Sequence, residues 1–336
     1  MVRLAVHHPV GDRHTADAAM MAATLVGATR AYRRVLEVTF LILLNGSLHA
    51  FSYLPYRLRR QALRIAFLFL APVMAGLDLD STSRAFATIL ASSKRQGRKF
   101  AGRKMYYDMV AMIEWLALGR RSIAGLASDI QCLSSDAAED LQWLAAQRGA
   151  IIGTMHFGPY ALGLVWLIHS HFQNRKVIIF KNANAGEEAR AIERLGNLGA
   201  EVEFVSPTAL LDFHRIIKEV RKGAIVIIMV DLPPAASRSD DFDLLGRQVA
   251  VATGAVDLAA MGRAPLMLLR VRADRRGDRI EIGDIFDVAH HDAGSRNRAV
   301  SRITRFVSET LHVYPEQWHM WSRFGEYLQQ QSDPAS

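Results

Sequence analysis

Residues 149–163 read GAIIGTMHFGPYALG, and this stretch decides the fold of the chain. The apolar run at 150–155 has the length of a buried strand, and His156 follows it directly. Gly158 permits a tight turn, and Pro159 suits the first positions of a helix. The stretch therefore predicts a strand, a sharp turn and a helix, with an imidazole at the junction.

Similar short apolar runs recur along the chain, separated by stretches that are compatible with helices. Apolar strands that alternate with helices indicate a mostly parallel sheet covered on both faces. A long helix at 295–312 closes the pattern. We therefore predict an α/β fold, with a mostly parallel central sheet flanked by helices, in a domain spanning residues 81–330. The further strands are predicted at 176–180, 201–205, 224–230, 265–272 and 279–286.

The region before the sheet is helical in pattern, from about residue 35 to residue 143. Residues 1–30 are weakly patterned and are predicted to be partly disordered. Residues 38–56 carry no formal charge and approach the roughly 20 apolar residues that span a bilayer, although several polar side chains interrupt them. A second apolar stretch follows at 65–77. We predict that residues 1–80 form an apolar, basic and helical N-terminal segment that associates with a membrane.

Four arginines separate the two apolar stretches: Arg57, Arg59, Arg60 and Arg64. Arginines that flank apolar helices suit lipid headgroups, each with about 1 kcal/mol near an anionic surface. They favour a peripheral or single-span protein. The alternative is a pair of core helices that cover the domain.

The formal net charge is +8, and no acidic residue interrupts the six cations of the stretch at 94–104. Such a balance suits anionic partners such as headgroups, phosphorylated substrates or acidic carrier proteins. The chain has no recognition-helix or zinc-finger signature, so we expect no nucleic-acid partner. Cys132 is the single cysteine, which excludes a disulfide within the chain.

Two ionisable residues follow predicted strands directly. His156 comes after the strand at 150–155, and Asp231 comes after the strand at 224–230. Ligands of open α/β sheets gather at the carboxyl ends of the strands. An imidazole there is placed to accept a proton from a bound hydroxyl, which contributes about 10²–10⁴ in rate. The alternative is a histidine that only makes local hydrogen bonds.

Four blocks of the chain, taken together, resemble the lipid A biosynthesis acyltransferases, the lauroyl and myristoyl transferases of the lysophospholipid acyltransferase superfamily. They occur in the same order as in that family, and the resemblance covers about residues 50–325. The blocks are GAIIGTMHFGPYALG at 149–163, VRKGAIVIIMVDLPP at 220–234, DLLGRQVAVATGAVDLAAMGRAPLMLLRV at 243–271 and YPEQWHMWSRF at 314–324.

The resemblance implies an acyltransferase in which His156 is the catalytic histidine of an H-x4-D/E motif. The histidine deprotonates an acceptor hydroxyl, which attacks an acyl thioester on acyl carrier protein or coenzyme A. The implied acceptor is a lipid, glycolipid, sugar or secondary metabolite, at the cytoplasmic face of the inner membrane. No metal or other cofactor is implied. The residues implied to bind substrate are Tyr160, Arg194, Asp231, Thr253, Gly254 and Arg323.

The chain departs from the family at one position that matters for the chemistry. Ala161 stands where the motif has aspartate or glutamate, and an alanine cannot orient an imidazole. Three interpretations follow. The histidine acts alone on an easier acceptor, a substrate or partner supplies the missing group, or the protein binds acyl groups without transferring them. The first two predict an enzyme, and the third predicts a degenerate accessory protein that binds acyl groups or lipid. Tyr160 and Asp231 are candidate replacements.

Overall fold

A six-stranded sheet with the order β3-β2-β4-β1-β7-β8 forms the centre of the described chain. The structure, a computed structural model, describes residues 46–74, 80–90, 93–120, 122–130, 135–180, 200–206, 210–274, 277–289 and 292–328. The chain divides into the units Met1–Ser47 and Leu48–Ser336, and almost all described residues belong to the second. The predicted boundary at residue 80 stays a prediction.

The sheet is mostly parallel, as predicted. Each of the six predicted strands agrees with an observed strand to within one residue at either end. Strands β1 to β4 and β7 run parallel to one another, whereas β8 at one edge runs antiparallel to β7. The strands are β1 (Ala150–Thr154), β2 (Lys176–Phe180), β3 (Glu201–Val205), β4 (Ile225–Met229), β7 (Leu266–Arg272) and β8 (Arg279–Phe286).

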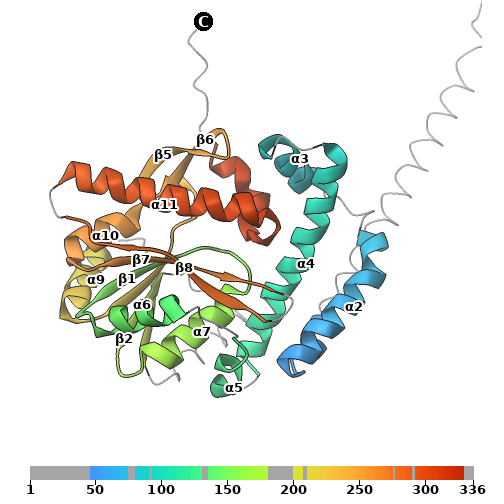
Figure 1. Ribbon diagram of the computed structural model, residues 1–336, viewed down its shortest axis with the longest axis horizontal. Coiled ribbons are helices and arrows are strands. Elements are labelled where there is room, and N and C mark those ends of the chain that lie inside the picture. Colours follow the sequence, from blue (N-terminus) through green and yellow to red (C-terminus); the bar gives the residue numbers. More distant parts are fainter. Residues whose placement is uncertain are drawn as a thin grey trace, which may run out of the picture. The chain divides into compact units, whose positions relative to one another are not determined.

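Helices cover both faces of the sheet, which confirms the predicted α/β fold. On β1, Ile151 packs into one apolar cluster and Ile152 into the other, because successive side chains of a strand point to opposite faces. Figure 1 shows α11 on one side of the sheet, and α6 and α7 on the other. The helices of the first cluster are α9 (Leu210–Lys222), α10 (Gly254–Gly262) and α11 (Ala293–Val313), and those of the second are α6 (Ser135–Ala146) and α7 (Tyr160–His171).

Helices also fill the described part of the chain before the sheet, as predicted. Residues 35–45 of that prediction lie outside the described residues. Helix α4 is the longest, and Ser93 and Gln96 form a capping box at its start. These helices are α2 (Tyr56–Met74), α3 (Asp80–Ile89), α4 (Lys94–Leu118) and α5 (Ile123–Ala127).

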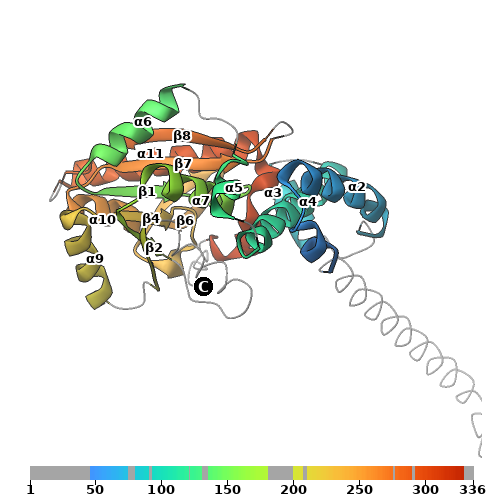
Figure 2. The same cartoon turned by 90° about the horizontal axis from the view of Figure 1, so that it is seen from below.

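Helix α2 is fixed to the rest of its unit by buried charges. Helices α2 and α4 lie side by side in both views (Figures 1 and 2). Arg59 and Arg60 both donate to the fully buried carboxylate of Glu114 on α4, and Arg60 also pairs with Asp278. Removing one partner of such a buried pair costs about 3–5 kcal/mol. The prediction that these two arginines face lipid headgroups is therefore wrong, because they face buried carboxylates.

Within the described ranges, no helix combines the length and the apolar character that crossing a bilayer requires. The second apolar stretch begins inside α2, and its residues 75–77 lie outside the described residues. Residues 38–45 of the first stretch lie outside them too.

A small two-stranded sheet was not predicted. Strands β5 (Ser239–Leu244) and β6 (Arg247–Ala252) form a hairpin that follows the short 3-10 helix η1 (Pro234–Ala236). Leu245 and Gly246 make its two-residue turn, both with positive φ as tight hairpins require. Three aspartates in β5 hide the strand in the sequence, because aspartate is depleted in strands.

Candidate active site

His156 stands at the carboxyl end of β1, on the sharp turn that leads into α7. Gly158 in that turn has a φ of +53°, a left-handed conformation that favours glycine. A Cβ atom there would lie 2.2 Å from the carbonyl oxygen of Val271. Pro159 follows, and α7 begins at Tyr160. The predicted strand, turn and helix are confirmed, and they fix the position of the imidazole.

Asp231 lies beside His156, because the strands that carry the two residues are neighbours. β1 pairs with β4 in parallel register, with Thr154 opposite Met229, so both chains leave the sheet at the same edge. The Nδ1 atom of His156 lies 3.0 Å from Oδ1 of Asp231. The backbone N–H of His156 donates to Oδ2 of the same carboxylate at 2.8 Å. The sequence places both residues at strand ends, and the structure brings them into contact.

This contact sets the state of the imidazole. A carboxylate only accepts hydrogen bonds, so the proton of the neutral ring lies on Nδ1, and Nε2 carries the lone pair. Within the described part of the chain, Nε2 of His156 has no hydrogen-bond partner. The side chain is 23% exposed. The arrangement thus leaves one basic nitrogen accessible and ties the other to a buried negative charge.

Two aromatic residues, Trp318 and Tyr327, hold Asp231 in place. The indole N–H of Trp318 donates to its Oδ2 atom at 2.8 Å, and the Tyr327 hydroxyl donates to its backbone carbonyl at 2.5 Å. Both rings are 1% exposed, and burial raises the pKa of Tyr327. They follow the short 3-10 helix η2 (Pro315–Gln317) and flank η3 (His319–Glu326). The sequence did not reveal these partners, because nothing in it shows that Trp318 reaches a residue 87 positions away.

Tyr160 faces the histidine with its ring rather than with its hydroxyl. The two ring centres lie 5.7 Å apart in an edge-on arrangement. The hydroxyl of Tyr160 accepts a hydrogen bond of 3.2 Å from the indole of Trp115 on α4. Burial raises the pKa of Tyr160, which keeps its phenol protonated. Tyr160 therefore lines the site, and its described hydrogen bond goes to Trp115 rather than to His156.

Ala161 lies in apolar core. Its side chain is 2% exposed and packs in the cluster beneath α7, together with Leu162 and Val165. A carboxylate there would be buried among apolar side chains, which favours its neutral form. The position that holds an acid in the motif is therefore part of the core in this protein.

Thr253 and Gly254 lie near the same edge of the sheet but in a separate hydrogen-bond network. The N–H of Ala252 donates to the carbonyl of Leu232, which places the end of β6 beside the residue after Asp231. The Thr253 hydroxyl donates to Asp240 at 2.5 Å. Arg296 on α11 also pairs with Asp240, and it holds the pKa of that carboxyl below its usual value. Gly254 donates its N–H to the hydroxyl of Ser237.

The two arginines proposed to bind substrate stand differently. Arg323 lies on η3, and its guanidinium pairs with the exposed carboxylate of Glu326 at 2.6 Å. No described contact joins Arg323 to His156 or Asp231. Arg194 lies outside the described residues.

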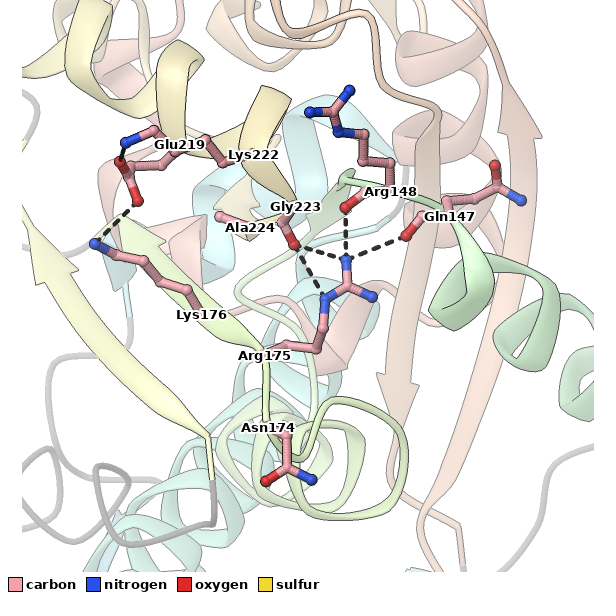
Figure 3. A pocket seen from close by; sticks show the side chains of 9 residues that line it. All are labelled: Gln147, Arg148, Asn174, Arg175, Lys176, Glu219, Lys222, Gly223 and Ala224. Atoms are coloured by element: carbon pink, nitrogen blue, oxygen red, sulfur yellow. Dashed lines mark hydrogen bonds and ion pairs between the residues drawn. The ribbon is translucent and has the colours of Figure 1, made fainter.

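A polar hollow lies at the opposite edge of the sheet, where β1, β2 and β4 begin (Figure 3). Arg175 dominates it, but the guanidinium is bound to backbone carbonyls. Burial lowers its pKa without a compensating carboxylate. The sheets of α/β proteins bind ligands at the carboxyl ends of their strands, and this hollow lies at the amino ends. We therefore interpret it as a structural feature rather than a binding site. The accepting carbonyls are those of Ala145, Gln147, Arg148 and Gly223.

Comparisons with known proteins identify the family of the chain. The family model of the bacterial lipid A biosynthesis acyltransferases matches residues 32–324. No protein in the curated set matches the chain. The matched range contains the strand ends that carry His156 and Asp231, the threonine–glycine pair and the closing block. The family implies an acyltransferase that acts on lipid-type acceptors. The chain belongs to the bacterial lipid A biosynthesis acyltransferase family.

Proposed function

We propose that the protein transfers a fatty acyl group from a thioester to a hydroxyl acceptor, with His156 as the general base and Asp231 as the carboxylate that orients it. The observation that carries the proposal is the 3.0 Å contact between Nδ1 of His156 and Oδ1 of Asp231. It supplies from β4 the group that Ala161 cannot supply. The donor is an acyl thioester of acyl carrier protein or coenzyme A, and the acceptor is a lipid, sugar or secondary metabolite.

The reaction follows from the free nitrogen of His156. The acceptor hydroxyl gives its proton to Nε2, and its oxygen attacks the thioester carbonyl carbon. The resulting imidazolium is stabilised by the charge of Asp231, which is 1% exposed and held by N–H donors. The tetrahedral intermediate then expels the thiolate, which takes the proton from Nε2. A new ester and a free thiol are the products, and His156 returns to its initial state.

The experiment that tests this proposal measures thioester consumption and product mass with the full chain. The wild type should convert an acyl-carrier-protein or coenzyme A thioester into free thiol and an acylated lipid. His156→Ala should lose about 10²–10⁴ of this rate, the contribution expected of a general base. His312→Gln, an exposed histidine at the end of α11, serves as the matched control and should keep full activity. Undiminished turnover by His156→Ala would exclude the mechanism.

A second function is favoured by the apolar surroundings of Ala161. A family member whose motif position is part of the core could bind acyl chains without transferring them. That protein would bind fatty acid or acyl thioester without releasing thiol, and His156→Ala would leave its affinity unchanged. The thioester assay separates the two functions, because only the enzyme produces free thiol.

The outer face of α2 supports peripheral association with a membrane, at the cytoplasmic face of the inner membrane. Leu58, Ile65, Leu68 and Phe69 on this face are between 53% and 78% exposed. Arg57 and Arg64 are exposed on the same helix. Apolar side chains with neighbouring cations suit the interface of an anionic bilayer. The buried pairs of Arg59 and Arg60 hold the helix in place for this role.

Cosedimentation of the full chain with vesicles tests the association. Vesicles that contain phosphatidylglycerol should bind the protein more tightly than vesicles of phosphatidylcholine alone. The double variant Leu68→Gln/Phe69→Gln should bind at least about 30-fold more weakly, because burial of such side chains contributes on the order of 1–2 kcal/mol each. Trp143→Gln, another exposed apolar residue, is the control. Equal binding by both variants would contradict a role for this face.

A further inference from the structure

A second histidine–carboxylate pair lies beside the first. His319 begins η3, directly after Trp318. Its Nδ1 atom lies 2.7 Å from Oδ1 of Asp108 on α4. Its Nε2 atom lies 2.8 Å from the backbone carbonyl oxygen of Gly158, in the turn after His156. Both ring nitrogens are therefore engaged by oxygen atoms at hydrogen-bond distance.

The two oxygen atoms determine the charge of the His319 ring. A carboxylate and a backbone carbonyl accept hydrogen bonds and donate none. A neutral imidazole donates from one nitrogen only, so one of these short contacts would then set two lone pairs against each other. The imidazolium donates from both. Asp108 also accepts a hydrogen bond of 2.5 Å from Lys104, which holds the carboxylate in place as the counterion.

The pair is joined to the turn that carries His156. The N–H of His319 donates to the carbonyl of His156 at 2.9 Å, and the N–H of Gly158 donates to the carbonyl of Gln317 at 2.9 Å. Together with the ring bond to Gly158, these contacts hold the left-handed turn from one side. Both imidazoles lie near the ring of Tyr160, whose centre is 5.7 Å from that of His156 and 6.0 Å from that of His319.

We propose that His319 is a positioning residue that donates from both ring nitrogens, to Asp108 and to the carbonyl of Gly158, and thereby fixes the turn that carries the catalytic histidine. The ionisable groups that face it are Asp108 and Lys104 of α4, Tyr160 of α7 and His156. This role in turnover rests on the proposed function, whereas the charge of His319 does not.

The charge is tested without any assay of activity. In the full chain labelled with ¹⁵N-histidine, both ring nitrogens of His319 should give the chemical shifts of imidazolium at pH 7.5. His319→Gln assigns the signal by its loss. The exposed His312 gives the comparison signal in the same spectrum. A neutral His319 ring at pH 7.5 would overturn the proposal.

Kinetics then tests the positioning. His319→Gln should lower kcat about tenfold and leave KM within about twofold, because the variant disturbs the base rather than substrate binding. The acidic limb of its pH–rate profile should move to higher pH by about half a unit, since a nearby positive charge is lost. A purely structural residue would lower activity without moving that limb. His312→Gln, the same substitution at an exposed site, should change neither quantity.

The outcomes separate this inference from the proposed function. If the wild type consumes no thioester, the proposed function fails, and the ring shifts of His319 alone decide whether the cation exists. If the wild type is active and the acidic limb of His319→Gln is unmoved, the positioning charge is refuted. Thermal unfolding of each variant, monitored by circular dichroism, identifies a loss of activity that comes from loss of the fold.

Discussion

Two histidine–aspartate pairs in the described part of the chain use the same residue types differently. In the first, His156 binds Asp231 through Nδ1, and within the described chain its Nε2 has no partner. In the second, His319 uses both nitrogens, one on Asp108 and one on the carbonyl of Gly158. The second nitrogen therefore decides whether an imidazole can move a proton or serves as a fixed cation.

The two carboxylates differ as much as the two rings. Asp231 has no exposed side-chain surface, and its bonds come from N–H groups of His156 and Trp318. The side chain of Asp108 is 38% exposed and shares its charge with Lys104. Water screens an exposed charge far more than a buried one. Asp231 is thus the stronger partner for an imidazolium that forms during a reaction.

The largest effect is expected from Asp231→Asn. The amide N–H can donate to Nδ1 of His156, and the proton of the neutral ring then lies on Nε2. In this tautomer Nε2 cannot accept the proton of the acceptor hydroxyl. The same change in a serine-protease triad lowers turnover about 10⁴-fold, and we expect a loss of about 10³–10⁴ here. Initial rates of thioester consumption measure it. Asp241→Asn, at an exposed position of β5, is the control. Equal rates for the two variants would show that Asp231 has no special role in the first pair.

A smaller loss is expected from Trp318→Phe. The ring remains, but the indole N–H that donates to Oδ2 of Asp231 is lost. A hydrogen bond to a charged group contributes about 1.5–3 kcal/mol, so kcat should fall about 10- to 100-fold. Trp321→Phe is the matched control, because its indole donates to the carbonyl of Pro315 instead. Equal kcat values for both variants would show that this bond does not support the first pair.

Asp108→Asn should have a modest effect, about threefold to tenfold on kcat. The amide still offers an oxygen to His319, but it no longer supplies the negative charge that favours the imidazolium. The ¹⁵N shifts of His319 should therefore change from those of imidazolium toward those of neutral imidazole as the pH rises above 7. Retention of the imidazolium shifts at pH 8.5 would show that Asp108 is not the counterion.

Ala161→Glu is expected to change the rate least. Asp231 already occupies Nδ1 of His156, so a carboxylate restored to the motif position should give no gain in kcat. It should lower the thermal stability, because position 161 is buried among apolar side chains. Ala161→Gln introduces the same bulk without a charge and isolates the cost of the carboxyl group. A strong rise in kcat would instead reveal a degenerate motif that the acid repairs.

The sheet could be predicted from the sequence because its strands are short apolar runs between helical stretches. The same pattern placed His156 and Asp231 at strand ends, and parallel pairing of β1 with β4 then brings them to one edge. The β5–β6 hairpin was not predicted, because β5 is rich in aspartate, which is depleted in strands. The roles of Trp318 and His319 could not be predicted, since they depend on how the end of the chain folds back over the site.

The sequence composition does not distinguish the buried from the exposed arginines before the sheet. Arg57, Arg59, Arg60 and Arg64 look equivalent in the sequence, and all four suit a membrane surface. In the structure, Arg59 and Arg60 bind buried Glu114, whereas Arg57 and Arg64 face outward. Helical periodicity separates such faces, but the burial of Glu114 and Asp278 decides which arginines turn inward.

A double-mutant cycle on His156 and Asp231 measures whether the two residues act as one catalytic unit. The readout is the rate of thioester consumption. Residues that act as one catalytic unit are strongly non-additive, so His156→Ala/Asp231→Asn should be no slower than His156→Ala alone. The same cycle on His156 and Asp241, an exposed aspartate of β5, should be additive. If the losses of rate at His156 and Asp231 simply multiplied, Asp231 would not act through the histidine. The proposal that Asp231 orients His156 as the general base would then be wrong.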